Sequence, residues 1–422
     1  MNDSNPKLNT KEPSVPKTLV YLSLLFIPGF YITLFIGATL PIFVYFFLST
    51  YIHIHSKSST DFQILMTIIG IGSIIVLIAC ARVFRYLYKK EPEFYPAEYL
   101  HMSEEPNLKL FIYELCSEMK IDFPDFVILN SKPKFFSLNG NIKVLNGDIT
   151  GKILAIGSPI IGNISVKEFR ALLAHELAHF SGNDAKYTLL TLPIIKKANS
   201  SIAYLNEEIK KSHNLFLTIA NISIYLPILF LNIYLYAFWL FNWKISILRE
   251  KRADWISSSI CGKEVFSSAL KKMHGLSIAF KEMSKEDIIE VLTEKRMFTN
   301  YYMEFRNKFS QNDQLLINFV NQSLSDKSRI FNLHQILSKR VNSLPISNIS
   351  NEERVIALSL FSNLPLHETD LSNNLTTDIS KHYAREIHRR KKILGERCPH
   401  CYMITFELTK KCHICGKIIR NY

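Results

Sequence analysis

Residues 165–184 read SVKEFRALLAHELAHFSGND, and the local pattern predicts an α-helix. Ser165 and Glu168 form an S-x-x-E capping box, which satisfies free backbone N–H groups at a helix start. The next eleven residues contain no Pro or Gly, and apolar side chains recur at helical spacing to give a stripe that faces the core. Gly182 ends the predicted helix, because glycine readily adopts the left-handed conformation after a last turn.

This helix carries the pattern H-E-x-x-H, formed by His175, Glu176 and His179. Histidines four residues apart project from the same helix face, so both imidazoles can bind one metal ion. The carboxylate of Glu176 lies where it can take a proton from a metal-bound water. A chance match on a buried helix is the alternative, and a third protein ligand elsewhere in the chain would distinguish a zinc site from it.

The candidate third ligand is Glu250, which lies in the segment REKRAD at 249–254 after a hydrophobic stretch. Asp254 follows four residues later on the same helical face, where its carboxylate can accept the free ring N–H of a ligand histidine. Alone, these two acids would fit a solvated, charged helix start. Together with the paired histidines they predict a catalytic zinc site, because His, His and Glu leave the fourth coordination position open for substrate.

HELAH with a downstream E-x-x-x-D after a membrane segment resembles the membrane-bound gluzincin metallopeptidases, relatives of the CAAX prenyl protease and of the stress protease HtpX. The similarity covers roughly residues 80–345. KILAIGSPII at 152–161 resembles the family's edge strand beside the active-site helix, and HQILSKRV at 334–341 resembles its H-P-x-L-x-x-R-[IV] motif. The residues Asn-Asp at 183–184 match the usual ending of that helix, whereas Lys-Phe-Phe at 134–136 replaces the usual Asn-Ala-Phe.

The resemblance implies a zincin-like catalytic domain, built from a small mixed sheet and active-site helices, that hydrolyses peptide bonds. It also implies that His334 stabilises the oxyanion of the tetrahedral intermediate and that Asp184 supports the metal ligands from outside. An extended peptide would pair with the free backbone edge of the strand. The residues implied to contact substrate are Leu154, Ala155, Ile156, Gly157 and Arg340. For His334 and Arg340, an ordinary surface helix is the alternative.

Two uncharged stretches near the N-terminus predict two transmembrane helices within residues 19–90. Residues 19–48 and 62–81 contain no Asp, Glu, Lys or Arg, and each is long enough to cross a hydrocarbon core of about 30 Å. The loop between them holds only Lys57 as a basic residue. The outer flanks carry Lys7, Lys11, Lys17, Arg82, Arg85, Lys89 and Lys90. The positive-inside rule therefore places the N-terminus and the catalytic domain in the cytoplasm.

A third uncharged stretch, residues 212–243, lies between the two ligand motifs. As one helix it would span about 48 Å, which is too long for one crossing and too short for two. Both ligand motifs must lie on the same side of the membrane. We therefore expect a membrane-associated helical hairpin across about 186–243, with two full crossings or a buried soluble helix as the alternatives.

The C-terminus carries two C-x-x-C pairs separated by ten residues. This spacing predicts a structural zinc ribbon over residues 397–422, with four thiolates and no open coordination position. The thiolate ligands are Cys398, Cys401, Cys412 and Cys415. Disulfides are the alternative, which a reducing cytoplasm disfavours. Residues 346–396 are predicted to be a linker with a short helix, and residues 1–18 a flexible tail.

The sequence thus predicts a mainly α, multi-pass protein of the cell membrane with a metallopeptidase domain at 91–345. We expect it to bind one catalytic and one structural zinc ion and to cleave membrane or membrane-associated proteins at the cytoplasmic face. Its net charge of +13 favours contact with anionic lipid rather than nucleic acid, because the chain lacks an aromatic-basic platform. The alternative is a non-proteolytic membrane scaffold that recruits partners through the ribbon. A scaffold, however, would not need the complete set of metal ligands together with the general base.

Overall fold

The computed structural model divides the chain into two compact units. Unit 1 comprises Met1–Pro92 and His179–Trp255, and unit 2 comprises Glu93–Ala178 and Ile256–Tyr422. The described residues are 16, 18, 21–22, 25–55, 60–87, 93–181, 195, 197–207, 209, 224–293, 300–310, 313–325 and 356–384. The predicted site residues that lie outside them are Asp184, His334, Arg340, Cys398, Cys401, Cys412 and Cys415.

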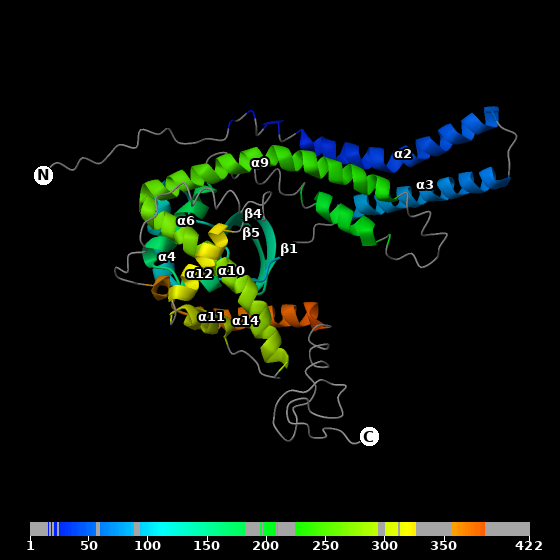
Figure 1. Cartoon of the computed structure of the whole chain (residues 1–422). Coiled ribbons are helices and arrows are strands. Elements are labelled where there is room, and N and C mark those ends of the chain that lie inside the picture. The colour runs from blue at the N-terminus through cyan, green and yellow to red at the C-terminus, as the bar shows by residue number, and fades with distance from the viewer. Residues whose placement is uncertain are drawn as a thin grey trace, which may run out of the picture. The chain divides into compact units, whose positions relative to one another are not determined.

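Long apolar helices form unit 1. They are α2 (Phe26–His55), α3 (Thr60–Leu87) and the greater part of α9 (Tyr225–Cys261), and α2 lies beside both of the others (Figure 1). A Cβ atom added at Gly37 of α2 would lie 2.8 Å from the Cα atom of Pro227, so glycine is needed for α2 and α9 to approach this closely. The Tyr234 hydroxyl on α9 also donates a hydrogen bond to the Phe26 carbonyl at 2.7 Å.

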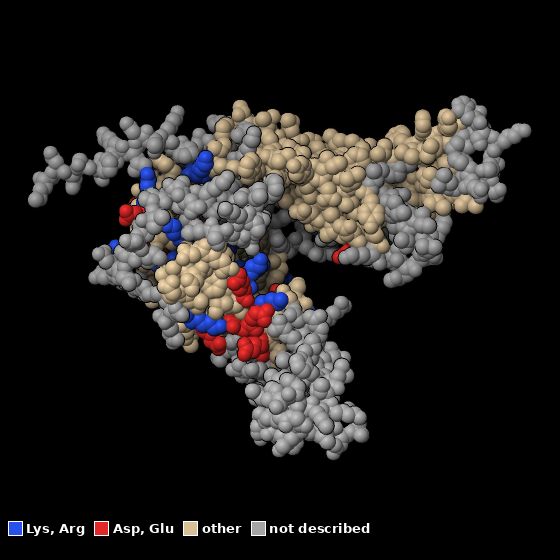
Figure 2. All heavy atoms as spheres, viewed as in Figure 1, with Lys and Arg blue, Asp and Glu red and all other residues tan. Residues whose placement is uncertain are grey.

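The described parts of these helices show few Lys, Arg, Asp or Glu side chains in Figure 2, and many of their large apolar side chains are exposed. Four phenylalanines of α2 are 61–72% exposed, namely Phe35, Phe43, Phe46 and Phe47. Among the described residues, Pro28–Tyr51 and Pro227–Cys261 are long and apolar enough to cross a membrane, by length and composition. The first agrees with the predicted span at 19–48. The second lies in α9 rather than in α3, where the apolar stretch Met66–Ile78 is shorter.

The helix α9 is one uninterrupted helix of 37 residues that joins an apolar half to the charged segment with Glu250. The second leg of the predicted hairpin therefore continues into that segment without a break. Residues 197–207 are helical, as expected for the first leg. The turn between the legs and the number of membrane crossings stay predictions.

Unit 2 contains the predicted mixed sheet, which has five strands in the order β1-β4-β5-β3-β2. The strands are β1 (Glu93–Phe94), β2 (Ala97–Tyr99), β3 (Phe126–Asn130), β4 (Phe136–Val144) and β5 (Gly147–Gly157). β4 and β5 pair in antiparallel fashion, whereas β3 pairs with β5 in parallel. The side chains of β5 from Ile153 to Ile156 are fully buried, because the strand lies at the centre of the sheet.

The prediction that residues 152–161 form an edge strand is wrong. β5 pairs with β3 along Ile153–Gly157 and with β4 along Gly147–Ala155, so its backbone groups are used on both sides. Beyond Ala155 on the β4 side, Gly157 meets the backbone of residues 132–134 at distances that leave no room for a side chain. Leu154, Ala155, Ile156 and Gly157 thus lie inside the sheet. They offer no free edge to a peptide.

Helices surround this sheet and place the H-E-x-x-H motif. They are α4 (Pro106–Met119), α5 (Ser158–Ile161), α6 (Val166–Ala178), α10 (Lys263–Thr293), α11 (Tyr301–Ser310), α12 (Asp313–Ser325), the 3-10 helix η2 (Ala357–Leu360) and α14 (Leu364–His382). The predicted capping box of α6 is confirmed, with Ser165 N 2.8 Å from Glu168 Oε2 and Glu168 N 3.2 Å from Ser165 Oγ. Lys272 and Ser268 of α10 also contact the Glu168 carboxylate, at 2.8 and 2.6 Å, which fixes α6 against α10.

The helix expected inside the C-terminal linker is α14, and it packs into unit 2. It is 19 residues long, and its buried side chains include Leu364, His367, Glu368 and Leu371. His367 contacts Glu98 of β2, and Glu368 contacts α5 and α11. The segment 356–384 is therefore part of the folded unit rather than a connection between units.

Candidate metal centre

His175 lies in the last turn of α6 and is buried. Its imidazole stacks on the Phe266 ring of α10, with 5.8 Å between ring centroids and 20° between the ring planes. Phe266 is itself 1% exposed, so the stacked pair has little room to move. The packing of α10 thus sets the orientation of the first ligand histidine.

His179 follows directly after α6, and its Nε2 atom lies 3.7 Å from Oε1 of Glu250 on α9. One donor atom each from His175, His179 and Glu250 lies within 4.8 Å of the other two. Two ligands of a tetrahedral zinc ion are separated by roughly 3–4 Å, since each lies about 2.0–2.2 Å from the metal. Two imidazoles and one carboxylate at these separations fit a zinc ion, as the sequence predicts.

Arg252 holds the residues after α6 against α9. Its guanidinium donates hydrogen bonds to the carbonyl and the hydroxyl of Ser181, at 3.1 and 3.0 Å. Because Arg252 lies two residues after Glu250, this contact links the segment that contains His179 to the helix that carries the third ligand. The sequence contains no spacing rule that would have paired Arg252 with Ser181.

Glu176 faces the sheet from α6. Ser137 on β4 is the nearest hydrogen-bond donor that the structure gives to its carboxylate, with 3.4 Å between Ser137 Oγ and Glu176 Oε2. A hydrogen bond of this length is weak, yet it places the carboxylate beside β4. The sequence does not reveal this contact, because no spacing rule pairs a strand serine with a helix glutamate 39 positions later.

Among the described residues, part of β4 has a strand partner on one side only. β1 pairs with β4 only at Ile142 and Lys143, which leaves residues 136–141 without a strand partner on that side among the described residues. Ser137 lies in this free stretch. An unpaired strand of this kind offers backbone donors and acceptors to an extended peptide.

Asp254 lies on α9 one helical turn after Glu250 and is half-buried. This placement agrees with the predicted shared helix face. Its contact with a ligand histidine stays a prediction, as do the roles of Asp184, His334 and Arg340 and the four-cysteine zinc ribbon.

Comparison with known proteins gives one family assignment. The family model described as Peptidase family M48 matches residues 105–345, which include the H-E-x-x-H motif and Glu250. No curated protein and no solved structure gives a significant match to the chain. The matched segment covers more than half of the 422 residues and ends before α14.

Proposed function

The chain belongs to peptidase family M48, and from that premise we propose a membrane-anchored endopeptidase that cleaves membrane or membrane-associated proteins at the cytoplasmic face. It is a zinc metallopeptidase, with His175, His179 and Glu250 as its metal site. The observation that carries the proposal is the convergence of these three side chains, with Glu176 next to the first of them in the sequence.

The zinc ion, when bound, polarises the scissile carbonyl and lowers the pKa of a water molecule towards neutrality. Glu176 removes a proton from that water and later delivers it to the nitrogen of the departing amine. Ser137 steadies the base by donating a hydrogen bond to its carboxylate. Phe266 keeps the His175 imidazole in its orientation through stacking.

We propose that the substrate binds as an extended strand along residues 136–141 of β4. This edge replaces the predicted edge at 152–161, because β5 is paired on both sides. Backbone pairing accepts many sequences, so it suits an endopeptidase that acts on unfolded or flexible segments. It also brings the peptide to Ser137, which lies beside the base.

The membrane anchor is supported by α2 and α9, the two helices of sufficient length and apolarity among the described residues. The cytoplasmic orientation is inferred from the basic residues that flank residues 19–81 on both outer sides. The proposed structural zinc is held by Cys398, Cys401, Cys412 and Cys415, and it requires the reduced thiolates that a cytoplasmic location provides. His334 is proposed to stabilise the oxyanion, and Asp254 and Asp184 to support the metal ligands.

Substitution of the base tests this function. Glu176→Gln keeps the size of the side chain but cannot accept a proton, so it should leave zinc bound and the fold intact while abolishing hydrolysis. Purified protein with fluorescein-labelled β-casein gives the rate. Proteomic comparison of membranes from cells with wild-type or Glu176→Gln protein gives the substrates. Residual activity above a few per cent of wild type would show that Glu176 is not the base.

A further inference from the structure

One short segment joins the sheet to the active-site helix. Residues 158–165, here called the connector, begin directly after β5 and end at the cap of α6. Any shift of the connector moves the start of α6, which carries His175 and Glu176. What holds the connector therefore bears on the position of the base and of the first metal ligand.

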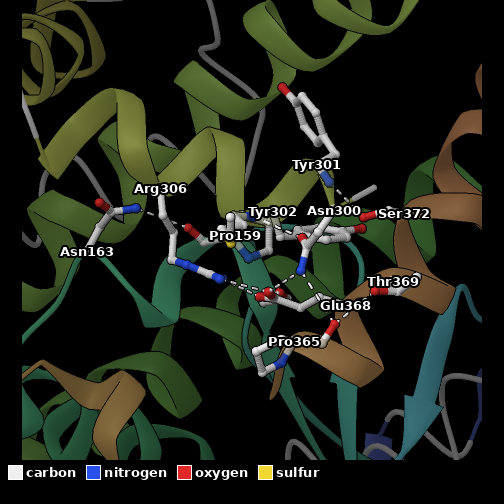
Figure 3. A network of polar contacts seen from close by, with 12 residues as sticks. Pro159, Asn163, Asn300, Tyr301, Tyr302, Arg306, Pro365, Glu368, Thr369 and Ser372 are labelled. Atoms are coloured by element: carbon white, nitrogen blue, oxygen red, sulfur yellow. Dashed lines mark hydrogen bonds and ion pairs between the residues drawn. The ribbon is translucent and has the colours of Figure 1, made fainter. Parts of the chain in front are cut away.

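A fully buried carboxylate holds the beginning of the connector. Glu368 of α14 is 0% exposed and accepts a hydrogen bond of 2.6 Å from the Ser158 hydroxyl. Figure 3 shows the same carboxylate facing Arg306 of α11 and Asn300, with Arg306 Nη2 at 2.8 Å and Asn300 Nδ2 at 3.1 Å from Glu368 Oε2. Arg306 Nη1 also contacts Glu368 Oε1, so the pair is bidentate. The charge is thus compensated inside unit 2.

The stem of Arg306 lies against the middle of the connector. A Cβ atom added at Gly162 would lie 1.8 Å from Arg306 Cδ and 2.7 Å from Arg306 Cγ, so the arginine occupies the space of the missing side chain. The connector and the Arg306–Glu368 pair therefore meet at Ser158 and at Gly162. Two contacts four residues apart define both the position and the rotation of the short helix α5.

The end of the connector is held by η2. Ala357 N donates a hydrogen bond to the Ile164 carbonyl at 3.1 Å, and Ile356 forms an antiparallel bridge with Ser165, the cap residue of α6. Both η2 and α14 lie beyond the stretch that matches the family model, which ends at residue 345. Residues 356–384, which follow the family match, thus contact the connector at its first and last residues.

We propose that Arg306 and Glu368 are positioning residues for peptide hydrolysis, through which α11 and α14 fix the connector and hence α6. This inference rests on the proposed function for its kinetic consequence. A buried ion pair is weak evidence for a role in stability, because an apolar pair of similar volume often serves stability equally well. A displacement of about 1 Å at a catalytic group, in contrast, costs on the order of a hundredfold in rate. The pair therefore determines where α6 lies more than whether unit 2 folds.

The test compares R306M/E368M with wild type, using fluorescein-labelled β-casein and the zinc content of the full chain. The double variant should fold with its Tm within a few degrees of wild type and bind zinc. Its kcat should fall about tenfold or more while KM stays within about twofold. The matched control is Lys308→Met, which removes the 2.6 Å ion pair of the same helix with Asp287 and leaves the connector untouched. A double variant that folds and keeps its kcat would overturn the proposal.

Two further measurements keep the outcome decisive. Ser158→Ala removes only the hydrogen bond between the connector and Glu368, so it should lower kcat severalfold even if the double variant fails to fold. Hydrogen exchange of residues 166–178 should accelerate about tenfold in either variant but not in Lys308→Met, and this readout needs no activity. Unchanged exchange in α6 would refute the positioning role. A wild-type protein that cleaves nothing, with accelerated exchange in the variants, would instead refute the proposed function alone.

Discussion

His367 anchors the first turn of α14 to β2, and this contact should make the stability of unit 2 depend on pH. Its Nδ1 atom lies 2.7 Å from Oε1 of Glu98, and its Nε2 atom lies 4.0 Å from Oε1 of Glu105. The hydrogen bond with Glu98 raises the pKa of His367 above the ordinary value of 6.5, burial opposes this, and the charges of Glu98, Glu105 and Glu104 add to it. The groups that face the ring from β2 and from the start of α4 are thus all acidic.

The sign of the effect follows from the direction of this pKa shift. The protonated ring is favoured in the folded state, so its contribution to stability is fully present below about pH 6.5. The contribution is lost as the pH rises through the higher pKa of the folded state. A hydrogen bond between charged partners contributes roughly 1.5–3 kcal/mol, which sets the upper limit of the loss. For a unit of this size, each kcal/mol of stability that is lost lowers the Tm by about 2–4 °C.

His367→Gln isolates this contribution, because glutamine can still donate to Glu98 but does not titrate. Thermal unfolding followed by circular dichroism in detergent, at pH 6 and at pH 9, should show the variant less stable than wild type at pH 6. The difference should shrink at pH 9. His382→Gln is the matched control, since His382 lies on the same helix with its side chain 73% exposed. A stability difference between wild type and His367→Gln that is the same at both pH values would refute the reasoning.

Three further predictions concern the metal centre and the membrane. Glu250→Ala should remove both the activity and the catalytic zinc, whereas Asp254→Ala should weaken zinc binding about ten- to a hundredfold. If metal analysis still finds the full zinc content in Glu250→Ala, the third ligand lies elsewhere. Phe266→Ala should destabilise unit 2 by about 3–5 kcal/mol, and it should weaken zinc binding because the His175 ring loses its stacking partner. Unfolding experiments measure the first effect and zinc titration the second. An unchanged zinc affinity would contradict the prediction. A cysteine placed at Ser58 should react with an impermeant thiol reagent on intact cells and one at Asn183 should not, and the reverse pattern would put the active site outside.

The helix α6 and the metal centre could be predicted because their determinants are local or follow a strict spacing. The capping box at Ser165 starts the helix, and the spacing of His175 and His179 fixes both donors on one face. Glu250 was identifiable as the remaining acid in a helical segment after an apolar stretch. Zinc chemistry demands these residue types, so few alternatives fit the chain.

The sequence does contain a physical indication that β5 is a central strand rather than an edge strand. Residues 153–156 read Ile-Leu-Ala-Ile, and a continuous apolar run indicates a strand that is covered on both faces, as central strands are. In β4, the polar Ser137 is followed by the buried, apolar Leu138. Such alternation indicates a strand with one solvent-exposed face, unlike the continuous apolar run of β5. The pairing of Arg306 with Glu368 was beyond reach, because no local pattern connects charges 62 positions apart.

The continuity of α9 links the membrane proposal to the choice of substrate. Its apolar part ends before Lys244, and Glu250 lies six residues further along the same helix, about 9 Å along the axis. If the apolar part of α9 enters the membrane as part of the proposed anchor, the third metal ligand lies close to the membrane surface, because a continuous helix fixes the distance. A segment that is itself tethered to the membrane reaches such a site at a high effective concentration, whereas a soluble protein must diffuse to it. The enzyme would then select substrates by location, while the backbone edge of β4 remains tolerant of sequence.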